Sequence, residues 1–493
     1  MKYLTAPLKL MTTDEMLLLH RKTVQLLETT GLGIEHEAFL DALEAHGAAV
    51  DRASQVAKLP AALTEKAARA IAGSPCLLNH DPQTVDEAVA ARTREFLEQP
   101  FSFAFGGSAL EVLDSDGRAS RRARYEDLEN LVRFGNGHPR IKYVGGPPVL
   151  FSWDEAGREV APELRELAGL AYMAKHCAKL GVHCPSNAVE VDFAVELCEL
   201  LTGSSQDKLD SPAFLAPLLG PKCSDSPLRI SAKPAETLYR LAQRGLPIIL
   251  APMPLAGGTS PVTPAATILI ANAEILGLMV ALWAVRATSR QNHVALTGII
   301  DMKTTVASFS SPNATLQDIG LAQLQKYVYG LECMSATDYI DAKYPGYQSG
   351  SERALKIAAT AACGNLYPSV GQLKAGLVCS SEQACLDIEA FDWMRHFMKG
   401  FEVSESSLCL DLIREQGIGA NFLTTDHTAH HFRNEFFFPT LSDRSGHQIH
   451  DMTEAARAEV ETTLARTPRF SRDAAVCAEI DRLYQKACER YSG

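Results

Sequence analysis

The sequence lacks the short motifs that most often reveal a function. Its twelve cysteines contain no C-x-x-C pair, which leaves zinc-ribbon and thioredoxin-like proteins without support. The glycine pairs Gly106-Gly107 and Gly257-Gly258 lack the G-x-G-x-x-G spacing of a dinucleotide-binding turn. Residues 1–11 have neither the apolar core nor the cleavage site of a signal peptide. We therefore expect a cytoplasmic protein with reduced cysteines.

An excess of positive charge is also missing. The chain has 47 basic and 59 acidic residues and a net charge of −12, which argues against a nucleic-acid or anionic-membrane surface over the whole protein. The most apolar stretch, Pro264 to Ala287, is interrupted by Asn272 and Glu274. This stretch therefore predicts a buried helix rather than a membrane span, and neither nucleic acid nor a membrane is an expected partner.

The sequence does contain an alternation of strand-like and helical segments. The first hundred residues repeat apolar positions at helical spacing, and after Pro100 short apolar runs alternate with longer helical stretches. Eight runs are candidate strands: Ser102–Gly106, Ile141–Gly146, Leu180–Cys184, Ala213–Leu218, Pro247–Pro252, His293–Ile299, Gly330–Ala336 and Ala375–Ser380.

Eight strands with crossover helices over about 280 residues predict an α/β fold of the (β/α)₈ TIM barrel type. We assign residues 1–100 to an N-terminal helical region, 101–400 to the barrel and 401–493 to a C-terminal cap of helices and loops packed on the barrel. A doubly wound open sheet is the alternative, but it usually carries the glycine-rich turn that is missing here.

In a barrel the active site lies at the carboxyl ends of the strands. Residues at or just after the expected ends include Phe105, Tyr143 and His183, followed by the run from Thr337 to Lys343 that contains Asp338 and Asp341. The aromatic side chains have an alternative role in core packing, and the aspartates an alternative role in loop hydrogen bonds.

Two groups of histidines raise the question of a metal. His176-Cys177 and His183-Cys184 repeat after seven residues, and His427, His430 and His431 share one helical segment. Neither spacing matches a common zinc pattern, and the second group lacks the glutamate of H-E-x-x-H. We predict no metal site in this chain.

Four segments in a fixed order carry a family resemblance. They are Gly257-Gly258-Thr259-Ser260-Pro261-Val262-Thr263-Pro264-Ala265 with Asn272-Ala273-Glu274-Ile275-Leu276; Leu113-Asp114 to Gly117 with Asp127; Thr337-Asp338 to Lys343 with Gln348 and Glu352; and Asp411-Leu412-Ile413 with His427-Thr428, His430 and Arg433. The chain resembles the trimethylamine methyltransferase family of corrinoid-dependent methyltransferases. The resemblance implies a (β/α)₈ barrel that moves a methyl group from a methylated amine to the cobalt of a separate corrinoid protein.

One departure from the founding members bears on the substrate. Those members carry pyrrolysine near the segment that corresponds to Ser335–Tyr347, where this chain has only standard residues. It is more similar to the members without pyrrolysine that act on quaternary amines such as glycine betaine. The resemblance thus implies demethylation of a betaine, with no cofactor tightly bound in this chain and the corrinoid (cobalamin) carried by the partner protein.

A quaternary ammonium needs aromatic faces or nearby negative charge, because it cannot donate a hydrogen bond. We expect the substrate to contact Phe105, Tyr143, His183, Asp338, Asp341, Tyr347 and Gln348, and the partner protein to contact His430 and Arg433. No residue is assigned as a certain catalytic group, because the partner's cobalt performs the chemistry.

Two other functions stay open at this stage. A barrel lyase or hydrolase would use Asp301, His183 and Lys343 as acid and base. A non-catalytic methylamine-binding protein would bind a betaine without transferring its methyl group. The sequence also leaves open whether copies of the chain associate.

Overall fold

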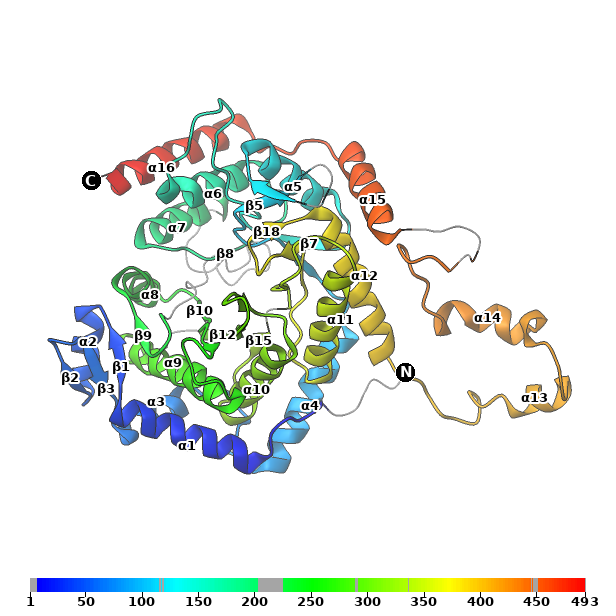
Figure 1. Ribbon diagram of the computed structural model, residues 1–493, viewed down its shortest axis with the longest axis horizontal. Coiled ribbons are helices and arrows are strands. Elements are labelled where there is room, and N and C mark those ends of the chain that lie inside the picture. The colour runs from blue at the N-terminus through cyan, green and yellow to red at the C-terminus, as the bar shows by residue number, and fades with distance from the viewer. Residues whose placement is uncertain are drawn as a thin grey trace.

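Short parallel strands surrounded by helices form the centre of the molecule (Figure 1). The structure is a computed structural model that describes residues 7–114, 117, 119–202, 225–288, 291–335, 337–444, 446 and 451–492. Among these residues the fold is mixed α/β with several parallel sheets. The helices around the strands are α5 (Tyr125–Gly137), α6 (Arg165–His176), α7 (Ala188–Thr202), α8 (Ala232–Arg244), α9 (Pro264–Val285), α10 (Pro312–Val328), α11 (Tyr347–Ala362) and α12 (Ser381–Met398).

The central strands form two parallel sheets. One has the order β16-β4-β7-β8, and the other has the order β10-β12-β15. A parallel bridge between Ser335 and Leu366 connects the end of β15 to the segment that leads into β16. The strands are β4 (Phe103–Phe105), β7 (Ile141–Gly146), β8 (Leu180–His183), β10 (Ile248–Leu250), β12 (Gln291–Ala295), β15 (Cys333–Ser335) and β16 (Ser369–Val370).

Six of the expected strands occur at or near their predicted positions, and Ile141–Gly146 has the predicted bounds. The expected strand Ala213–Leu218 lies outside the described residues. A strand also occurs within the eighth range, because Val378–Cys379 forms β18, but it joins a different sheet and the strand beside β4 is β16. The reason is a turn at Lys374 and Ala375, whose φ angles of 52° and 53° end β17 and reverse the chain into β18.

Smaller sheets form in the loops that follow the central strands. One has the order β17-β18-β5-β6 and the other the order β11-β13-β14. Their strands are β5 (Glu111–Leu113), β6 (Ser120–Arg122), β17 (Gln372–Leu373), β18 (Val378–Cys379), β11 (Leu255–Ala256), β13 (Gly298–Ile300) and β14 (Ala307–Ser308). These loops therefore have a regular backbone, which fixes the side chains at the carboxyl ends of the central strands.

The N-terminal region packs on one side of the ring of helices. It contains α1 (Thr13–Thr29), α2 (Glu37–Ala45), α3 (Ala61–Ile71) and α4 (Pro82–Glu98). The expectation of a helical region missed three short strands, β1 (Leu32–Ile34), β2 (Ala49–Asp51) and β3 (Val56–Lys58), which join β9 (Arg229–Ile230) in one sheet. At three residues each, β1 to β3 are too short to show a clear alternation of polar and apolar side chains.

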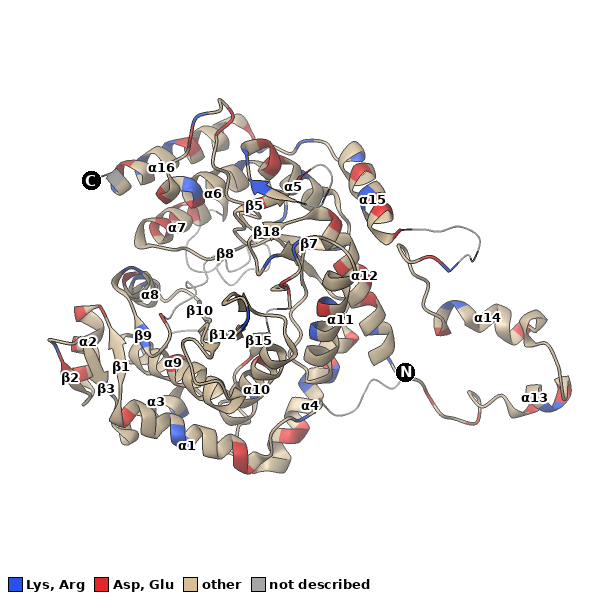
Figure 2. Ribbon diagram, in the orientation of Figure 1, with Lys and Arg blue, Asp and Glu red and all other residues tan. Residues whose placement is uncertain are grey.

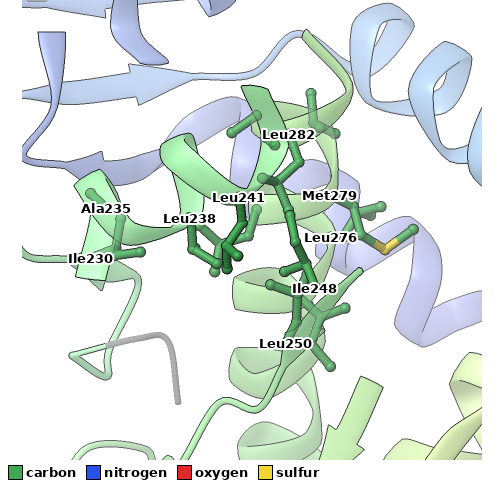
Figure 3. Packing of buried hydrophobic residues seen from close by; sticks show 14 of the residues in the cluster. Ile230, Ala235, Leu238, Leu241, Ile248, Leu250, Leu276, Met279 and Leu282 are labelled. Atoms are coloured by element: carbon green, nitrogen blue, oxygen red, sulfur yellow. The ribbon is translucent and has the colours of Figure 1, made fainter. Parts of the chain in front are cut away.

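Helix α9 lies at the centre of the largest hydrophobic cluster. Its 22 residues have a mean hydropathy of 2.1 over the most apolar stretch, and 78% of that stretch is buried inside the protein. Length and composition alone would suit a membrane span, but α1, α2, α3, α8 and α10 cover this helix. Figure 3 shows Leu276, Met279 and Leu282 of α9 packed against residues of α8 and β10. The prediction of a buried helix is confirmed.

The C-terminal region divides into two parts. Helices α15 (Met452–Arg466) and α16 (Ala474–Ser492) pack on the body, α15 against α5 and α12 and α16 against α6 and α7. The preceding part contains α13 (Leu410–Gln416), the short 3₁₀ turn η2 (Phe422–Thr424) and α14 (Asp426–Glu435), and it projects away from the body (Figure 1). Only the first of these parts behaves as a packed cap.

Candidate active site

Buried ionisable side chains gather where β12, β15 and β16 end. Asp338 follows β15 and accepts a hydrogen bond from the Ser369 hydroxyl on β16 at 2.7 Å. Arg353, on α11, donates to the carbonyl oxygens of Thr337 and Gln372 and forms an ion pair with Asp387 at 2.9 Å. Both partners of the ion pair are buried, so each depends on the other for its charge. The strand ends are thus held by a single arginine.

A second buried pair lies one turn further along α11. The Lys356 ammonium group donates to the carbonyl oxygens of Phe309 and Tyr339 at 3.0 and 2.9 Å. Asp318, on α10, accepts from the backbone and hydroxyl of Thr297 at 2.6 and 2.8 Å. Burial raises the pKa of Asp318 to about 7, against the opposing influence of Lys356. Burial likewise lowers the pKa of Lys356.

Three polar side chains from other strand ends act electrostatically on Tyr367, which precedes β16. Burial raises the pKa of Tyr367, and Asp338, Cys184 and Tyr143 raise it further through their negative charge when ionised. Hydrogen bonds fix the segment of Asp338 beside Tyr367, because the Thr337 hydroxyl donates to the Tyr367 carbonyl at 2.6 Å. Tyr143 lies on the face of β7 opposite to Val144, whose side chain contacts Gly135 of α5. Tyr143 therefore points away from the surrounding helices and toward the inside of the ring.

His183 lies at the end of β8 but on the opposite side from this group. Its Nδ1 must donate to the Gly146 carbonyl at 2.8 Å, because a carbonyl only accepts. Burial and the neighbouring Glu190 raise the pKa of Glu166 to about 8, while His183 lowers it. Glu190 in turn accepts from the Ser186 backbone at 2.6 Å. Glu166 and Glu190 come from α6 and α7, so this cluster lies between β8 and the surrounding helices.

A cavity of about 500 Å³ brings two of the sequence motifs together. Its lining includes Asp114, Gly117 and Asp127 from the segment after β4, and Tyr344 and Pro345 from the segment after β15. Asp127 forms a two-pronged ion pair with Arg121 at 2.7 and 2.8 Å. One of the cavity's lining carboxylates, Asp127, is therefore already paired within the chain.

The aromatic residues expected to bind substrate occupy different environments. The Phe105 ring is wholly buried and packs against Phe134 with the ring centroids 5.4 Å apart. Tyr143 is half-buried and faces the inside of the ring. Tyr347 begins α11 and is 93% exposed. The three rings do not form one cluster, and Phe105 has the packing environment that the sequence offered as its alternative role.

Asp341 and Gln348 are brought together through Glu352. Asp341 accepts from the Ser308 hydroxyl and from the Phe309 backbone at 2.9 Å, and its own backbone donates to Glu352 at 2.8 Å. The Gln348 amide donates to Glu352 at 2.7 Å. These residues stabilise the loop between β15 and α11, directly beside Asp338.

His430 and Arg433 lie on α14 in the projecting part of the chain. His430 Nδ1 donates to the Asp426 carbonyl at 2.7 Å within the same helix, and the Arg433 guanidinium lies over the Phe432 ring at 4.7 Å. Both side chains are exposed or half-buried, and neither touches the strand ends. Any protein that contacts them meets a surface distinct from the candidate site.

The alternative function, a lyase or hydrolase with acid–base residues, is not supported by the environment of Asp301. Asp301 accepts from the backbones of Lys303 and Thr304 at 2.8 Å each, and these hydrogen bonds lower its pKa. A general acid needs a raised pKa, whereas Asp301 is an exposed turn-capping group. His183 is buried and Lys343 exposed, so the proposed trio shares no environment.

The histidine groups also have other partners. His176 Nδ1 donates to the Phe470 carbonyl at 3.2 Å, and Cys177 donates to the Asn136 side chain at 3.6 Å. Within the described ranges, one group, His138, Cys385 and Glu459, places three potential ligand atoms within 4.8 Å of one another. His138 Nδ1 accepts from the Arg140 backbone at 3.3 Å, so Nε2 carries the proton and donates to Glu459 at 3.1 Å. This protonation pattern favours a hydrogen bond over a metal.

The signature segment around α9 is structural. Gly258 approaches Ile300 so closely that an added Cβ would lie 2.8 Å from it, and Gly257 has a φ of 81°. Asn272 donates to Thr23 at 2.7 Å and to the Tyr329 hydroxyl at 3.1 Å, which connects α9 to α1 and α10. These residues hold the helix layer together and do not enter the site.

Sequence reasoning missed Tyr367 and Ser369, which complete the group around Asp338. Both belong to the segment that leads through β16, whose two residues give no apolar run. One sequence signal for β16 was present. Helix α11 follows β15, and a crossover helix must lead to a further parallel strand.

Comparison with known proteins agrees with this arrangement of motifs. The sequence model of the trimethylamine methyltransferase family matches residues 2–476. A trimethylamine methyltransferase of Methanosarcina barkeri is 26% identical over 499 residues, covering 99% of this chain and 96% of that protein. Its counterpart from Desulfitobacterium hafniense is 26% identical over 86% of this chain and 81% of its own length. A glycine betaine methyltransferase, also of Desulfitobacterium hafniense, is 24% identical over 89% and 87%.

Proposed function

This chain belongs to the trimethylamine methyltransferase family of corrinoid-dependent methyltransferases, and from that premise we propose that it demethylates a quaternary amine. The substrate we propose is glycine betaine or a related betaine. The methyl acceptor is the Co(I) of a cognate corrinoid protein, which is a second substrate rather than a group held by this chain. The absence of pyrrolysine from Ser335–Tyr347 is the observation that carries this choice.

The reaction needs no electrophilic helper when the amine is quaternary. The carbon–nitrogen bond breaks with both electrons passing to nitrogen, so the leaving group is a neutral tertiary amine. The methyl carbon forms its new bond to cobalt with the electron pair that Co(I) brings. The protein's contribution is to bind and orient the cation and to exclude water.

We propose that the cation binds inside the ring of strands, beside Tyr143, Tyr367 and Asp338. Two aromatic rings and a carboxylate offer contacts of about 0.5 to 2 kcal/mol per ring to a cation that cannot donate hydrogen bonds. The hydrogen bonds that join Asp338 to Ser369 at 2.7 Å and Thr337 to the Tyr367 carbonyl at 2.6 Å support the proposal, because they hold these segments side by side. Asp341, Tyr347 and Gln348 would then line the entrance, while Phe105 and His183 hold β4 and β8 in place from the outer side.

The fold we propose is the closed (β/α)₈ barrel, with residues 101–400 as its extent. The strand order β8-β7-β4-β16, followed across the Ser335–Leu366 bridge by β15-β12-β10, is the cyclic order that a barrel requires. A barrel also accounts for the position of the polar cluster at the strand ends.

We propose that the corrinoid protein docks over those ends in the cytoplasm. Exposed apolar side chains lie on loops that follow the strands: Val262, Met302, Val306, Tyr347 and Leu377. Contiguous apolar side chains in such loops are typical of a protein contact. Docking there would bring the cobalt to the amine, because both would meet at one face.

The test is a cobalt methylation assay. The purified protein is mixed with a Co(I) corrinoid protein and a panel of betaines, with trimethylamine for comparison, and cobalt methylation is followed by its absorbance. We expect a betaine to react and trimethylamine to react poorly. Asp338→Asn should reduce the rate, whereas Asp192→Asn, whose carboxylate pairs with Arg244 on the outer helices, should not. Comparable or faster methylation from trimethylamine than from every betaine would overturn the substrate assignment.

A further inference from the structure

The part of the chain from residue 401 to 440, here called the arm, leaves the body after α12 and returns before α15 (Figure 1). The structure describes all forty of these residues, and none of them is buried. By contrast, every helix that surrounds the central strands has buried residues on it. The arm therefore contributes nothing to the core of its own chain.

The arm is nevertheless a built structure with fixed ends. At its start, the Lys399 ammonium group donates to the Asn434 carbonyl at 2.7 Å. At its return, the Glu389 carboxylate of α12 accepts from the backbones of Thr440, Leu441 and Ser442 at 2.9, 2.5 and 3.0 Å. The Leu441 side chain is buried beside this anchor. These contacts close the arm into a loop with a defined base.

The surface of the arm is unusually apolar for exposed chain. Ten large apolar side chains on it are exposed: Phe401, Val403, Leu408, Leu410, Ile413, Ile418, Phe422, Leu423, Phe436 and Phe438. Helix α14 itself carries Asp426, Arg433, Glu435 and three histidines, so the exposed apolar side chains lie before and after it (Figure 2). At the base, Trp393 and Phe397 of α12 are also exposed, and Trp393 contacts Phe437 with centroids 6.3 Å apart. The apolar surface thus continues from the arm onto the body.

This surface needs a cover in water. The helices of the arm have 7 and 10 residues, and isolated helices shorter than about 12 residues are marginal in water. Its exposed side chains amount to about 1,000 Å² of apolar area, whereas the largest patch on a typical monomer is about 300 to 600 Å². The order of the arm therefore depends on a surface outside its own chain.

We propose that the arm docks on a second copy of this chain, which returns its own arm in the same way. A stable interface buries about 1,200 to 2,000 Å² in total, and two such arms with the surfaces beneath them exceed that area. A second copy is also present whenever the chain is made, so the apolar surface is never left exposed. Exchange of identical elements gives a closed, symmetric assembly.

The corrinoid protein fits this surface less well. Under the proposed function it must leave after each methylation, and interfaces that form and dissociate are smaller and more polar than permanent ones. The loops over the strand ends already offer it a contact near the reacting atoms. His430 and Arg433, which the sequence suggested as its contacts, belong to the arm and are here assigned to the second copy.

The experiment measures mass in solution and uses neither amine nor cobalt, so its failure is distinct from failure of the proposed function. Sedimentation velocity of the full chain, from about 0.1 to 50 μM, should give at least twice the monomer mass of 53.5 kDa. The double variant Ile418→Glu/Leu423→Glu should weaken association at least tenfold. Both side chains are exposed in the single chain, so its circular dichroism and melting below the dissociation range should not change.

Met302→Glu is the matched control, because it adds a charge at an equally exposed apolar residue on the strand-end loops. It should leave the assembly intact. A wild-type monomer at 50 μM would overturn the proposal, as would an assembly that persists in the double variant. An arm variant that keeps its mass but no longer binds the corrinoid protein would assign the arm to that partner instead.

Discussion

The strand-end region buries charged side chains, whereas the arm exposes apolar ones. At the strand ends, Arg353, Lys356, Asp318 and Asp387 are all buried, and each has a charged or hydrogen-bonding partner within the chain. In the arm, phenylalanines and leucines are exposed, and no described residue between 401 and 440 is buried. At the strand ends, charged side chains that are costly to bury have partners within the chain. In the arm, apolar side chains that would gain free energy from burial are left exposed to water.

The difference shows where each region obtains its order. A buried ion is stable only with a partner in place, so the strand ends are fixed by the fold of the single chain. An exposed apolar side chain gains free energy only when something covers it, so the arm obtains stability from association. Substitutions in the two regions should therefore differ in size and in their dependence on protein concentration.

The largest expected effect comes from Arg353. Replacing it with methionine leaves Asp387 buried without its counter-charge and should lower the free energy of unfolding by about 3 to 5 kcal/mol. Urea denaturation measures this. Arg433→Met, in the arm, should change it by less than about 0.5 kcal/mol.

A double variant sharpens this test. Arg353→Met/Asp387→Leu removes both charges and should recover part of the loss, because no unpaired ion stays buried. Equal losses from Arg353→Met and Arg433→Met would remove the distinction between the two regions.

Two leucines provide the next comparison. Leu241, on α8, is wholly buried, and its replacement by alanine should cost about 2 to 5 kcal/mol at every protein concentration. Leu423, in the arm, is 77% exposed. Its replacement by alanine should have no effect in dilute solution and a growing effect as concentration rises, because association stabilises the folded chain by mass action.

Melting temperatures measured across a hundredfold range of concentration separate the two leucines. A concentration-independent loss from Leu423→Ala would indicate that the arm packs within its own chain.

The sequence predicted the parts of the fold whose signals are local. Strand β7 has its predicted bounds because Ile141, Tyr143 and Val144 form a strand-like segment that ends in the pair Gly145-Gly146. Asp338 was expected beside the site because it follows a recognisable strand. Strand β16 has two residues, Ser369 and Val370, so the predicted eighth strand fell on a later apolar run instead. Tyr367 was missed for the same reason.

Features that depend on tertiary contacts could not be predicted from the sequence. Glu166 and Glu190 meet across two helices, and no spacing in the sequence announces that encounter. The arm contains helical patterns and was expected to pack as a cap. The spacing of its apolar residues is the same whether they contact the body of the same chain or another chain. Periodicity predicts that a face is buried but not by what.

The carboxyl pair at β8 should make stability depend on pH. The pKa of Glu166 is raised from 4.5 to about 8, so the folded state retains a proton that the unfolded state loses. The stabilisation is complete below about pH 4.5 and is lost as pH rises to about 8, by up to about 1.4 kcal/mol per pH unit. Glu166→Gln should reduce this slope and leave the part that Asp318 contributes, as measured by urea denaturation between pH 5 and pH 8.

A matched control lies in the arm, where no described residue between 401 and 440 is buried. His431→Gln is the matched control and should keep the wild-type pH dependence. A wild-type curve that rises from pH 5 to pH 8, or a Glu166→Gln curve that falls as the wild type does, would contradict the assignment.

The smallest expected effect separates a ring that faces the ligand from rings that do not. Tyr143→Leu should weaken betaine binding by about two- to thirtyfold, the value of one cation–π contact of roughly 0.5 to 2 kcal/mol. Phe105→Leu removes a ring packed against Phe134, so it should lower the melting temperature and leave the affinity unchanged. Phe438→Leu, in the arm, should change neither in dilute solution. Calorimetric titration beside melting curves distinguishes the three, and unchanged affinity in Tyr143→Leu would remove this ring from the proposed cation site.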